Sequence, residues 1–261
     1  MMRENRVRQI WAAGGTVLNG WCSIPSGFAA ELMAQLGWDS LVIDAQHGLV
    51  GYSDMVAMLQ GISTTAVTPL VRVPWNAPAE IMKALDAGAY GIICPMINSR
   101  AECAAFVGAC RYAPKGYRSS GPIRAALYGG PDYTVKANET VLAMAMIETR
   151  EALASLDAIV STPDLDAVYV GPSDLSVSMG LPHGLDRNED IVLRALADIL
   201  GACRRHGIKA GIHTGSAAYA KRMLEMGFDF VTLLSDARFM TLAAGETVRD
   251  MRTAITAQKK S

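Results

Sequence analysis

The sequence predicts an α/β fold, a (βα)8 TIM barrel built as a single domain over residues 1–261. Three observations predict it. Short apolar runs recur along the chain, and amphipathic segments that end near a glycine precede several of them. The runs are continuously apolar rather than alternating, as expected for parallel strands buried on both faces. Eight such runs fit within 261 residues, a usual length for this barrel.

The eight strands are expected near residues 21, 42, 69, 92, 144, 168, 210 and 231. Glycines close the helical segment before three of them, at Gly37, Gly88 and Gly227, where a left-handed residue commonly ends a helix. A doubly wound open sheet is the main alternative. It would favour a glycine-rich phosphate-binding turn after the first strand, and residues 20–25 do not supply one.

Helices are expected between most strands. One apolar face before the seventh strand consists of Val192, Leu196, Ile199, Leu200 and Cys203. Another helix should begin at Pro78, since proline suits the first helical turn. A final helix is predicted within residues 235–260. Two connections are long, residues 96–140 and 171–187, and both follow strands, on the side where barrel enzymes build their sites.

Composition excludes several classes of protein. Hydrophobic residues make up 51% and charged residues 19%, so the chain is not disordered. The 24 basic and 25 acidic residues leave no excess charge for binding nucleic acid. No apolar run is long enough to span a membrane. The five cysteines form no C-x-x-C pair, and the charged residues 1–11 lack a signal-peptide pattern, so we expect a cytoplasmic protein with reduced thiols.

Polar side chains gather where the predicted strands end. They are Asp44, Gln46 and His47 after the second strand, Arg72 after the third, Glu148 after the fifth, Ser173 and Asp174 after the sixth, and His213 after the seventh. In a barrel, the carboxyl-terminal ends of all strands surround one mouth. The sequence therefore predicts that these groups converge on one site.

The segments that carry these groups also resemble a known family. Residues 44–48, 72–74, 148–152 and 171–176 are similar, in the same order, to the HpcH/HpaI family of metal-dependent class II pyruvate aldolases. The resemblance implies a barrel assembled as a hexamer, with the C-terminal helix exchanged between subunits. It implies cleavage of 4-hydroxy-2-oxo acids, such as 4-hydroxy-2-oxoheptanedioate or 2-keto-3-deoxy sugar acids, to pyruvate and an aldehyde, and the reverse addition.

The resemblance also implies roles for single residues. Glu148 and Asp174 match the ligands of a divalent metal ion, and all-oxygen ligation favours Mg²⁺ or Mn²⁺, with Co²⁺ also accepted in the family. Arg72 matches the arginine that contacts the keto or enolate oxygen, although pairing with Asp44 is the alternative. His47 and Asp44 match a base dyad that removes the proton of the C4 hydroxyl.

Further substrate contacts are expected around these groups. Backbone N–H groups at Ser173 and Asp174 would bind the pyruvate carboxylate. Gln46 stands where many members carry Glu. His213 would face the aldehyde, and Arg124, in the long connection after the fourth strand, is a candidate for the distal end of the substrate.

Three rival interpretations remain at this point. A Schiff-base aldolase needs a lysine inside a strand, but residues 165–171 contain none and Lys209 begins the seventh strand. A CoA-thioester lyase of the same superfamily would need a further basic surface for the nucleotide. A non-catalytic barrel could retain the motif. Pyruvate release from 4-hydroxy-2-oxo acids with Mg²⁺ or Mn²⁺ separates them.

Overall fold

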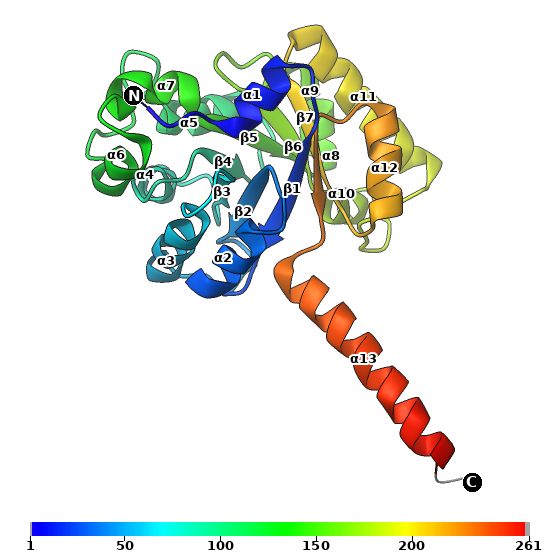
Figure 1. The fold of residues 1–261 in the computed structure, drawn as a ribbon. Helices are drawn as coiled ribbons and strands as arrows, with labels where there is room; N and C mark the ends of the chain where they lie inside the picture. The colour runs from blue at the N-terminus through cyan, green and yellow to red at the C-terminus, as the bar shows by residue number, and fades with distance from the viewer. Residues whose placement is uncertain (1, 259–261) are drawn as a thin grey trace.

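Eight parallel strands close into a barrel in the order of the chain (Figure 1). The computed structural model describes residues 2–258. The strands are β1 (Val17–Cys22), β2 (Ser40–Asp44), β3 (Thr68–Arg72), β4 (Gly91–Cys94), β5 (Leu142–Ile147), β6 (Ala167–Val170), β7 (Lys209–Thr214) and β8 (Phe230–Leu233). Each contains its predicted centre. Because β1 pairs with β8 as well as with β2, the barrel is confirmed and the open sheet is excluded.

Helices surround the barrel and join its strands (Figure 1). They are α1 (Arg6–Ala12), α2 (Gly27–Ala34), α3 (Tyr52–Ile62), α4 (Pro78–Asp86), α5 (Arg100–Cys110), α6 (Ile123–Gly129), α7 (Tyr133–Thr140), α8 (Arg150–Ala154), α9 (Leu156–Val160), α10 (Pro172–Ser178), α11 (Asp190–His206), α12 (Ala217–Met226) and α13 (Asp236–Gln258). The helix start at Pro78 is confirmed. So is the apolar face of α11, whose predicted members are all buried, and Gly207 ends that helix with a φ of 68°.

Side chains that point into the barrel fill it in layers. Val42, Met144 and Phe230 belong to this interior cluster. Their immediate neighbours on each strand point the other way, toward the surrounding helices. Helix α1 closes the amino-terminal end of the barrel. Its Trp11 packs against Phe230, and its indole N–H donates to the backbone oxygen of Asp229 at 3.0 Å. The barrel interior is therefore packed at that end.

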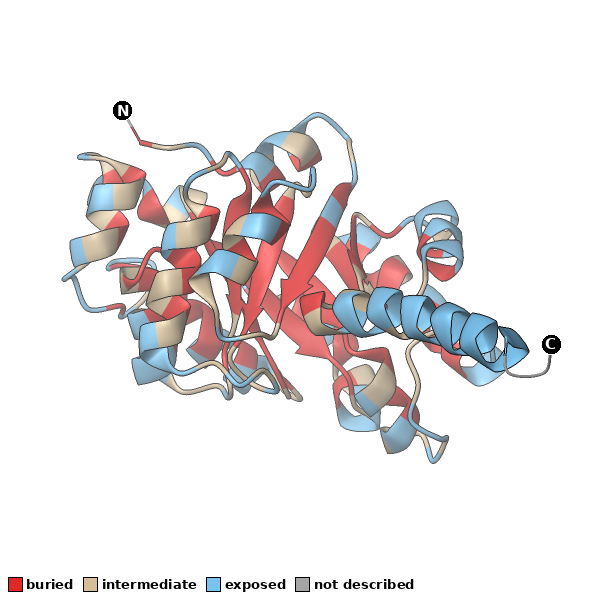
Figure 2. Cartoon of the chain, turned by 60° about the horizontal axis from the view of Figure 1, so that its bottom comes forward, coloured by how far each residue is buried: buried red, intermediate tan, exposed pale blue. Residues whose placement is uncertain are grey.

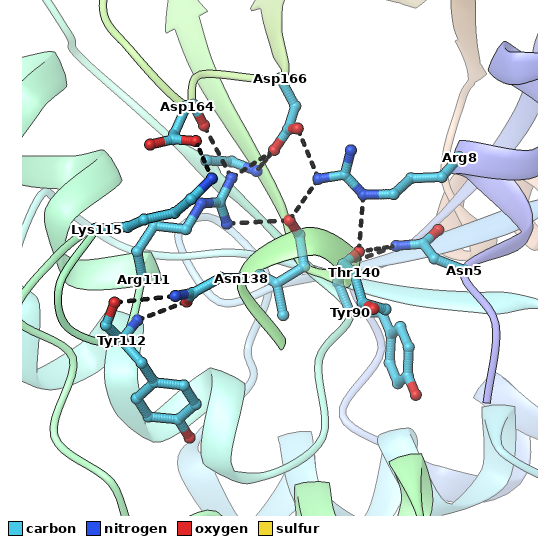
Figure 3. Close-up of polar contacts among 12 residues, drawn as sticks. Asn5, Arg8, Tyr90, Arg111, Tyr112, Lys115, Asn138, Thr140, Asp164 and Asp166 are labelled. Atoms are coloured by element: carbon cyan, nitrogen blue, oxygen red, sulfur yellow. Dashed lines mark hydrogen bonds and ion pairs between the residues drawn. The ribbon is translucent and has the colours of Figure 1, made fainter. Parts of the chain in front are cut away.

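A network of ion pairs also lies at the amino-terminal end, outside the strands (Figure 3). Asp166, just before β6, accepts hydrogen bonds from Arg8 at 2.6 Å, from Arg111 at 2.7 Å and from the backbone N–H of Ala143 at 2.8 Å. Both carboxylate oxygens of Asp166 are thus bonded to cations. The network ties α1 and α5 to the start of β5 and β6.

The last helix, α13, extends away from the barrel (Figure 1). Asp236, in its first turn, is its buried residue and accepts from the backbone N–H and the hydroxyl of Ser23 at 2.8 and 2.9 Å. The rest of the helix is largely exposed (Figure 2), including the apolar side chains of Met240, Leu242, Val248, Met251 and Ile255. The predicted helix is confirmed as far as residue 258, while positions 259 and 260 lie outside the described residues. Within residues 2–258 no helix is both long and apolar enough to cross a membrane.

Candidate active site

A cavity of about 260 Å³ opens at the carboxyl-terminal ends of the strands. It is lined by His47, Arg72, Met146, Tyr169, Gly171, Pro172, Ser173, Asp174, His183, Leu185 and His213. These residues come from strands β3, β5, β6 and β7 and from the segments that follow β2 and β6. The structure therefore brings five of the predicted site residues to one cavity, namely His47, Arg72, Ser173, Asp174 and His213.

Asp44 and Arg72 form a bidentate ion pair beside this cavity. Arg72 donates from Nε to Oδ1 at 2.9 Å and from Nη2 to Oδ2 at 2.7 Å. The indole N–H of Trp21 donates to the same Oδ2 at 3.1 Å. Burial alone would raise the pKa of Asp44, but the hydrogen bonds and charge of Arg72, with the Trp21 bond, lower it below its usual value. Asp44 is therefore a carboxylate whose main partner is Arg72.

The structure does not pair the side chains of Asp44 and His47 in the predicted dyad. The contact between them is the backbone N–H of His47, which donates to Oδ1 of Asp44 at 3.2 Å, as Gln46 does at 3.1 Å. The carboxylate closes this turn because Asp commonly bonds the backbone two or three residues on. Both oxygens also serve Arg72, so the imidazole of His47 lies exposed at the mouth without orientation by Asp44.

Glu148 is a buried carboxylate that follows β5. Its Oε1 accepts from the backbone N–H of Met96 at 2.7 Å, and Met96 adopts a positive φ of 56° after β4. Burial raises the pKa of Glu148 to about 7, against the Met96 bond, and the nearby charge of Asp174 raises it further. Among the described residues Glu148 has no ion pair. A buried acid of this kind is stabilised by a cation placed beside it.

Gly171 allows β6 to end directly against Glu148. A Cβ atom built at Gly171 would lie 2.5 Å from Oε2 of Glu148, too close for any side chain. The chain then turns into α10, where Asp174 lies exposed in the first turn. Because β5 and β6 are neighbours in the sheet, Asp174 lies near enough for its charge to act on Glu148, 26 positions earlier in the sequence.

The residues at this place fit a divalent cation. Two carboxylates from neighbouring strand ends supply oxygen donors and two negative charges, and the buried one, Glu148, forms no ion pair in residues 2–258. No cluster of three or more His, Cys, Asp or Glu side chains suited to a metal occurs within that range. An ion held here would therefore have two protein ligands and open positions for small molecules.

His213 lines the cavity from β7. Its Nδ1 lies 3.2 Å from the hydroxyl of Tyr169, which donates to Oγ1 of Thr232 at 2.8 Å. Its ring meets the edge of Trp21 with centroids 4.9 Å apart. Burial lowers the pKa of His213 to about 4, and the charge of Arg72 lowers it further, so the imidazole is neutral near pH 7.

Two other predicted residues lie differently. The side-chain oxygen of Gln46 is buried and has no hydrogen-bond partner in the described chain, and Gln46 does not line the cavity. Arg124 does not reach the cavity of its own chain. It donates to the backbone oxygen of Ala87 at 2.6 Å and to the hydroxyl of Ser63 at 3.2 Å, where α3 and α4 end. The reason is that residues 123–140 fold into α6 and α7, which lie near the amino-terminal ends of the strands.

A comparison with family models shows which protein family the chain belongs to. Residues 21–241 match the family model described as HpcH/HpaI aldolase/citrate lyase, which is well over half of the chain. The chain belongs to the HpcH/HpaI family. The resemblance seen in residues 44–48 and 171–176 is therefore confirmed.

Curated relatives of this HpcH/HpaI chain are aldolases. A hydroxypyruvate/pyruvate aldolase of Rhizorhabdus wittichii is 42% identical over 248 residues, covering 95% of this chain and 99% of the relative. A 4-hydroxy-2-oxo-heptane-1,7-dioate aldolase of Klebsiella pneumoniae is 35% identical and covers 92% of this chain and 91% of its own. These relationships make the chain an aldolase, a lyase that cleaves carbon–carbon bonds, and they do not favour the CoA-thioester lyase or the non-catalytic barrel.

A solved structure supports the fold of this family member. The HpcH/HpaI aldolase/citrate lyase family protein from Burkholderia cenocepacia superposes with a TM-score of 0.87 at 30% identity, over 95% of this chain and 99% of the other. The alignment covers nearly the full length of both chains.

Sequence reasoning missed four residues of this HpcH/HpaI site. Trp21 and Tyr169 lie among the inward-facing side chains, and His183 and Leu185 reach the cavity from the segment after α10. Trp21 and Tyr169 could have been found from the alternation of side-chain direction along each strand. Trp21 and Tyr169 share the inward parity of Arg72 and Glu148, which the strand registers fix. No pattern in the sequence distinguishes His183 and Leu185 from other loop residues.

Proposed function

We propose that the chain is a divalent-metal-dependent aldolase that cleaves 4-hydroxy-2-oxo acids to pyruvate and an aldehyde, and catalyses the reverse addition. The observation that carries the proposal is the buried carboxylate of Glu148, which feels the charge of Asp174, has no ion pair in the described chain, and shares with Asp44 the nearby charge of Arg72. The names of the relatives, which include hydroxypyruvate, pyruvate and 4-hydroxy-2-oxo-heptane-1,7-dioate, support the substrate class.

Glu148 and Asp174 would hold the ion, with Mg²⁺ or Mn²⁺ favoured by oxygen ligands and Co²⁺ also accommodated. When bound, the ion supplies a Lewis acid that polarises the 2-oxo group of the substrate. Because Glu148 is buried, little water would lie between its carboxylate and the ion, and their electrostatic attraction would be stronger than in water.

Arg72 would stabilise the oxygen that becomes negative when the C3–C4 bond breaks. Asp44 uses Nε and Nη2 of its guanidinium, and Nη1 has no hydrogen-bond partner within residues 2–258. Because Arg72 lines the cavity, this nitrogen is available to the enolate oxygen of the pyruvate fragment. The backbone N–H groups of Ser173 and Asp174, in the first turn of α10, would bind the carboxylate.

His47 would take the proton of the C4 hydroxyl in cleavage and return it in the addition. Its ring is exposed at the mouth and lines the cavity, so it can reach a substrate oxygen directly or through water. The neutral His213 faces the same space and would contact the aldehyde fragment. Gln46 is next to His47 in the sequence. It would bind the substrate through its side-chain amide oxygen, which has no hydrogen-bond partner in the described chain.

The proposal includes a homo-oligomer, which the resemblance makes a hexamer with α13 exchanged between subunits. The exposed apolar side chains along α13 support a protein partner for that helix. The proposal also includes a cytoplasmic location, which five buried, unpaired cysteines support.

The test measures pyruvate release from a panel of 4-hydroxy-2-oxo acids with lactate dehydrogenase as the coupling enzyme. We expect release with added Mg²⁺ or Mn²⁺, loss of release after EDTA treatment, and recovery when the ion is returned. Full activity in the EDTA-treated enzyme would contradict metal dependence. Covalent trapping of pyruvate by borohydride would instead indicate a Schiff-base enzyme.

A further inference from the structure

Trp21 occupies a position between the ion pair and the packed interior of the barrel. It lies on β1, is buried, and makes four directed contacts. Its indole N–H donates to Oδ2 of Asp44 at 3.1 Å, and the guanidinium carbon of Arg72 lies 4.9 Å from its ring centroid. The ring therefore touches both members of the pair.

The other two contacts fix the orientation of that ring. Tyr169 stacks on Trp21 with centroids 5.8 Å apart and planes 23° apart, and His213 meets it edge-on at 78°. Tyr169 is itself held because its hydroxyl donates to Thr232. An indole packed in this way has one direction for its N–H, and that direction is Oδ2 of Asp44.

The fixed indole also restricts the orientation of Arg72. A carboxylate that is fixed by a third group presents both oxygens in one plane, so the bidentate pair also fixes the guanidinium. The face of the guanidinium is covered by the indole, which opposes rotation about the side chain. The pair leaves Nη1 as the guanidinium nitrogen without a hydrogen-bond partner in residues 2–258, on a side chain that lines the cavity.

We propose that Trp21 is a positioning residue for the aldol reaction, which orients Arg72 through Asp44 so that the free guanidinium nitrogen meets the enolate oxygen. This inference rests on the proposed function, specifically on the role of Arg72. It also assigns Asp44 a task other than orienting His47.

The test compares two tryptophan-to-phenylalanine variants. Trp21→Phe removes the N–H that Asp44 accepts, and Trp11→Phe removes a similar indole bond, to the backbone of Asp229, at the opposite end of the barrel. We expect kcat to fall about tenfold in Trp21→Phe, the effect of one hydrogen bond to a charged group, with little change in KM. Trp11→Phe should keep the wild-type kcat. Both thermal stabilities are measured, so that unfolding is not mistaken for lost turnover.

Two readouts separate positioning from a merely structural role. The exchange of pyruvate methyl protons with D₂O, which needs the enolate but no aldehyde, should slow by the same factor as cleavage. Trp21→Phe should cause no additional loss in an Arg72→Lys background, because Trp21 acts through Arg72. Placing 3-benzothienylalanine at position 21 keeps the ring shape and removes only the N–H, so it should also lower kcat if Trp21→Phe fails to fold.

The outcomes are distinct. Wild-type exchange and cleavage rates in a folded Trp21→Phe or benzothienyl variant overturn the proposal, as does an equal fall in Trp11→Phe. If Arg72→Lys is itself fully active, the role of Arg72 in the proposed function fails and this inference fails with it. If Arg72→Lys is impaired while Trp21→Phe is not, the inference about Trp21 alone is wrong.

Discussion

The two ends of the barrel both bury charge, but they balance it differently. At the amino-terminal end, Asp166 is shared by Arg8 and Arg111, while Lys115 pairs with Asp164 at 2.7 Å (Figure 3). Arg111, almost fully buried, also donates to the backbone oxygens of Val141 and Asp164. A cavity of about 300 Å³ lies against this end, and Asp166, Arg8 and Lys209 on its wall are all paired.

At the mouth, Asp44 and Arg72 form an ion pair, whereas the carboxylate of Glu148 forms none within the described residues. Asp44 has its cation in Arg72, whereas Glu148 has a backbone N–H, a second acid nearby, and the charge of Arg72 only from beyond ion-pair contact. Burying a charge without a partner costs stability, so such an arrangement is retained only where something else requires it. Of these two cavities, the one at the amino-terminal end is the larger, so volume does not identify the site. The imbalance of charge selects the mouth.

The largest expected effect is the loss of activity in Glu148→Gln. The amide keeps the shape and can still accept from Met96, but it removes the charge that a cation needs. We expect kcat to fall about 10³-fold or more, because several kcal/mol of stabilisation by the ion are lost. Steady-state kinetics with saturating Mn²⁺ measure this. Asp174→Asn should lower kcat in the same way. If either variant is fully active, the uncompensated charge at the mouth has no role in catalysis, and the contrast with the amino-terminal end of the barrel is wrong.

The opposite result is expected at the amino-terminal end. Asp166→Asn leaves Arg8 and the buried Arg111 without their shared anion, which should lower the free energy of unfolding by about 3–5 kcal/mol. The folded enzyme should keep its kcat. Asp157→Asn breaks an exposed pair with Arg205, which water and salt screen, and should change the free energy of unfolding far less. Urea denaturation compares the three proteins, and a catalytic defect in folded Asp166→Asn would show that the two ends are not independent.

Arg72→Lys tests the balanced pair at the mouth. Lysine keeps the positive charge but cannot bond both oxygens of Asp44 and still offer a fixed donor to the substrate. We expect kcat to fall about 10²-fold, as for loss of one donor to a developing oxyanion. Mn²⁺ affinity, followed by electron paramagnetic resonance, should remain. Weaker metal binding together with lower turnover would place Arg72 in the metal site instead.

Most of the fold could be predicted because each strand is a local apolar run and each helix ends with a local signal. The site was only partly predictable. Glu148 and Asp174 follow from their place after neighbouring strands, and the pairing of Arg72 with Asp44 is the alternative that the sequence left open. The bond of Asp44 to Trp21 depends on how side chains pack inside the barrel. The position of Arg124 depends on how residues 113–133 fold back, and glycine, proline and tyrosine in that segment leave many courses open.

A further expected effect, on stability rather than on turnover, is a pH dependence in the metal-free protein. The pKa of Glu148 is about 7 in the folded chain and near 4.5 when unfolded, so between these values only the folded chain keeps the proton. Stability should therefore fall as pH rises from about 4.5 to 7, by roughly 3–4 kcal/mol at about 1.4 kcal/mol per pKa unit.

Glu148→Gln cannot lose that proton, so it isolates this contribution. With EDTA present, the variant should gain stability over the wild type as pH rises, until the difference becomes constant above pH 7. Urea denaturation at intervals between pH 5 and 8 measures the difference. A difference that does not change with pH would mean that Glu148 is already compensated in the metal-free protein. The contrast with Asp166, whose cations are supplied by the chain itself, would then be lost.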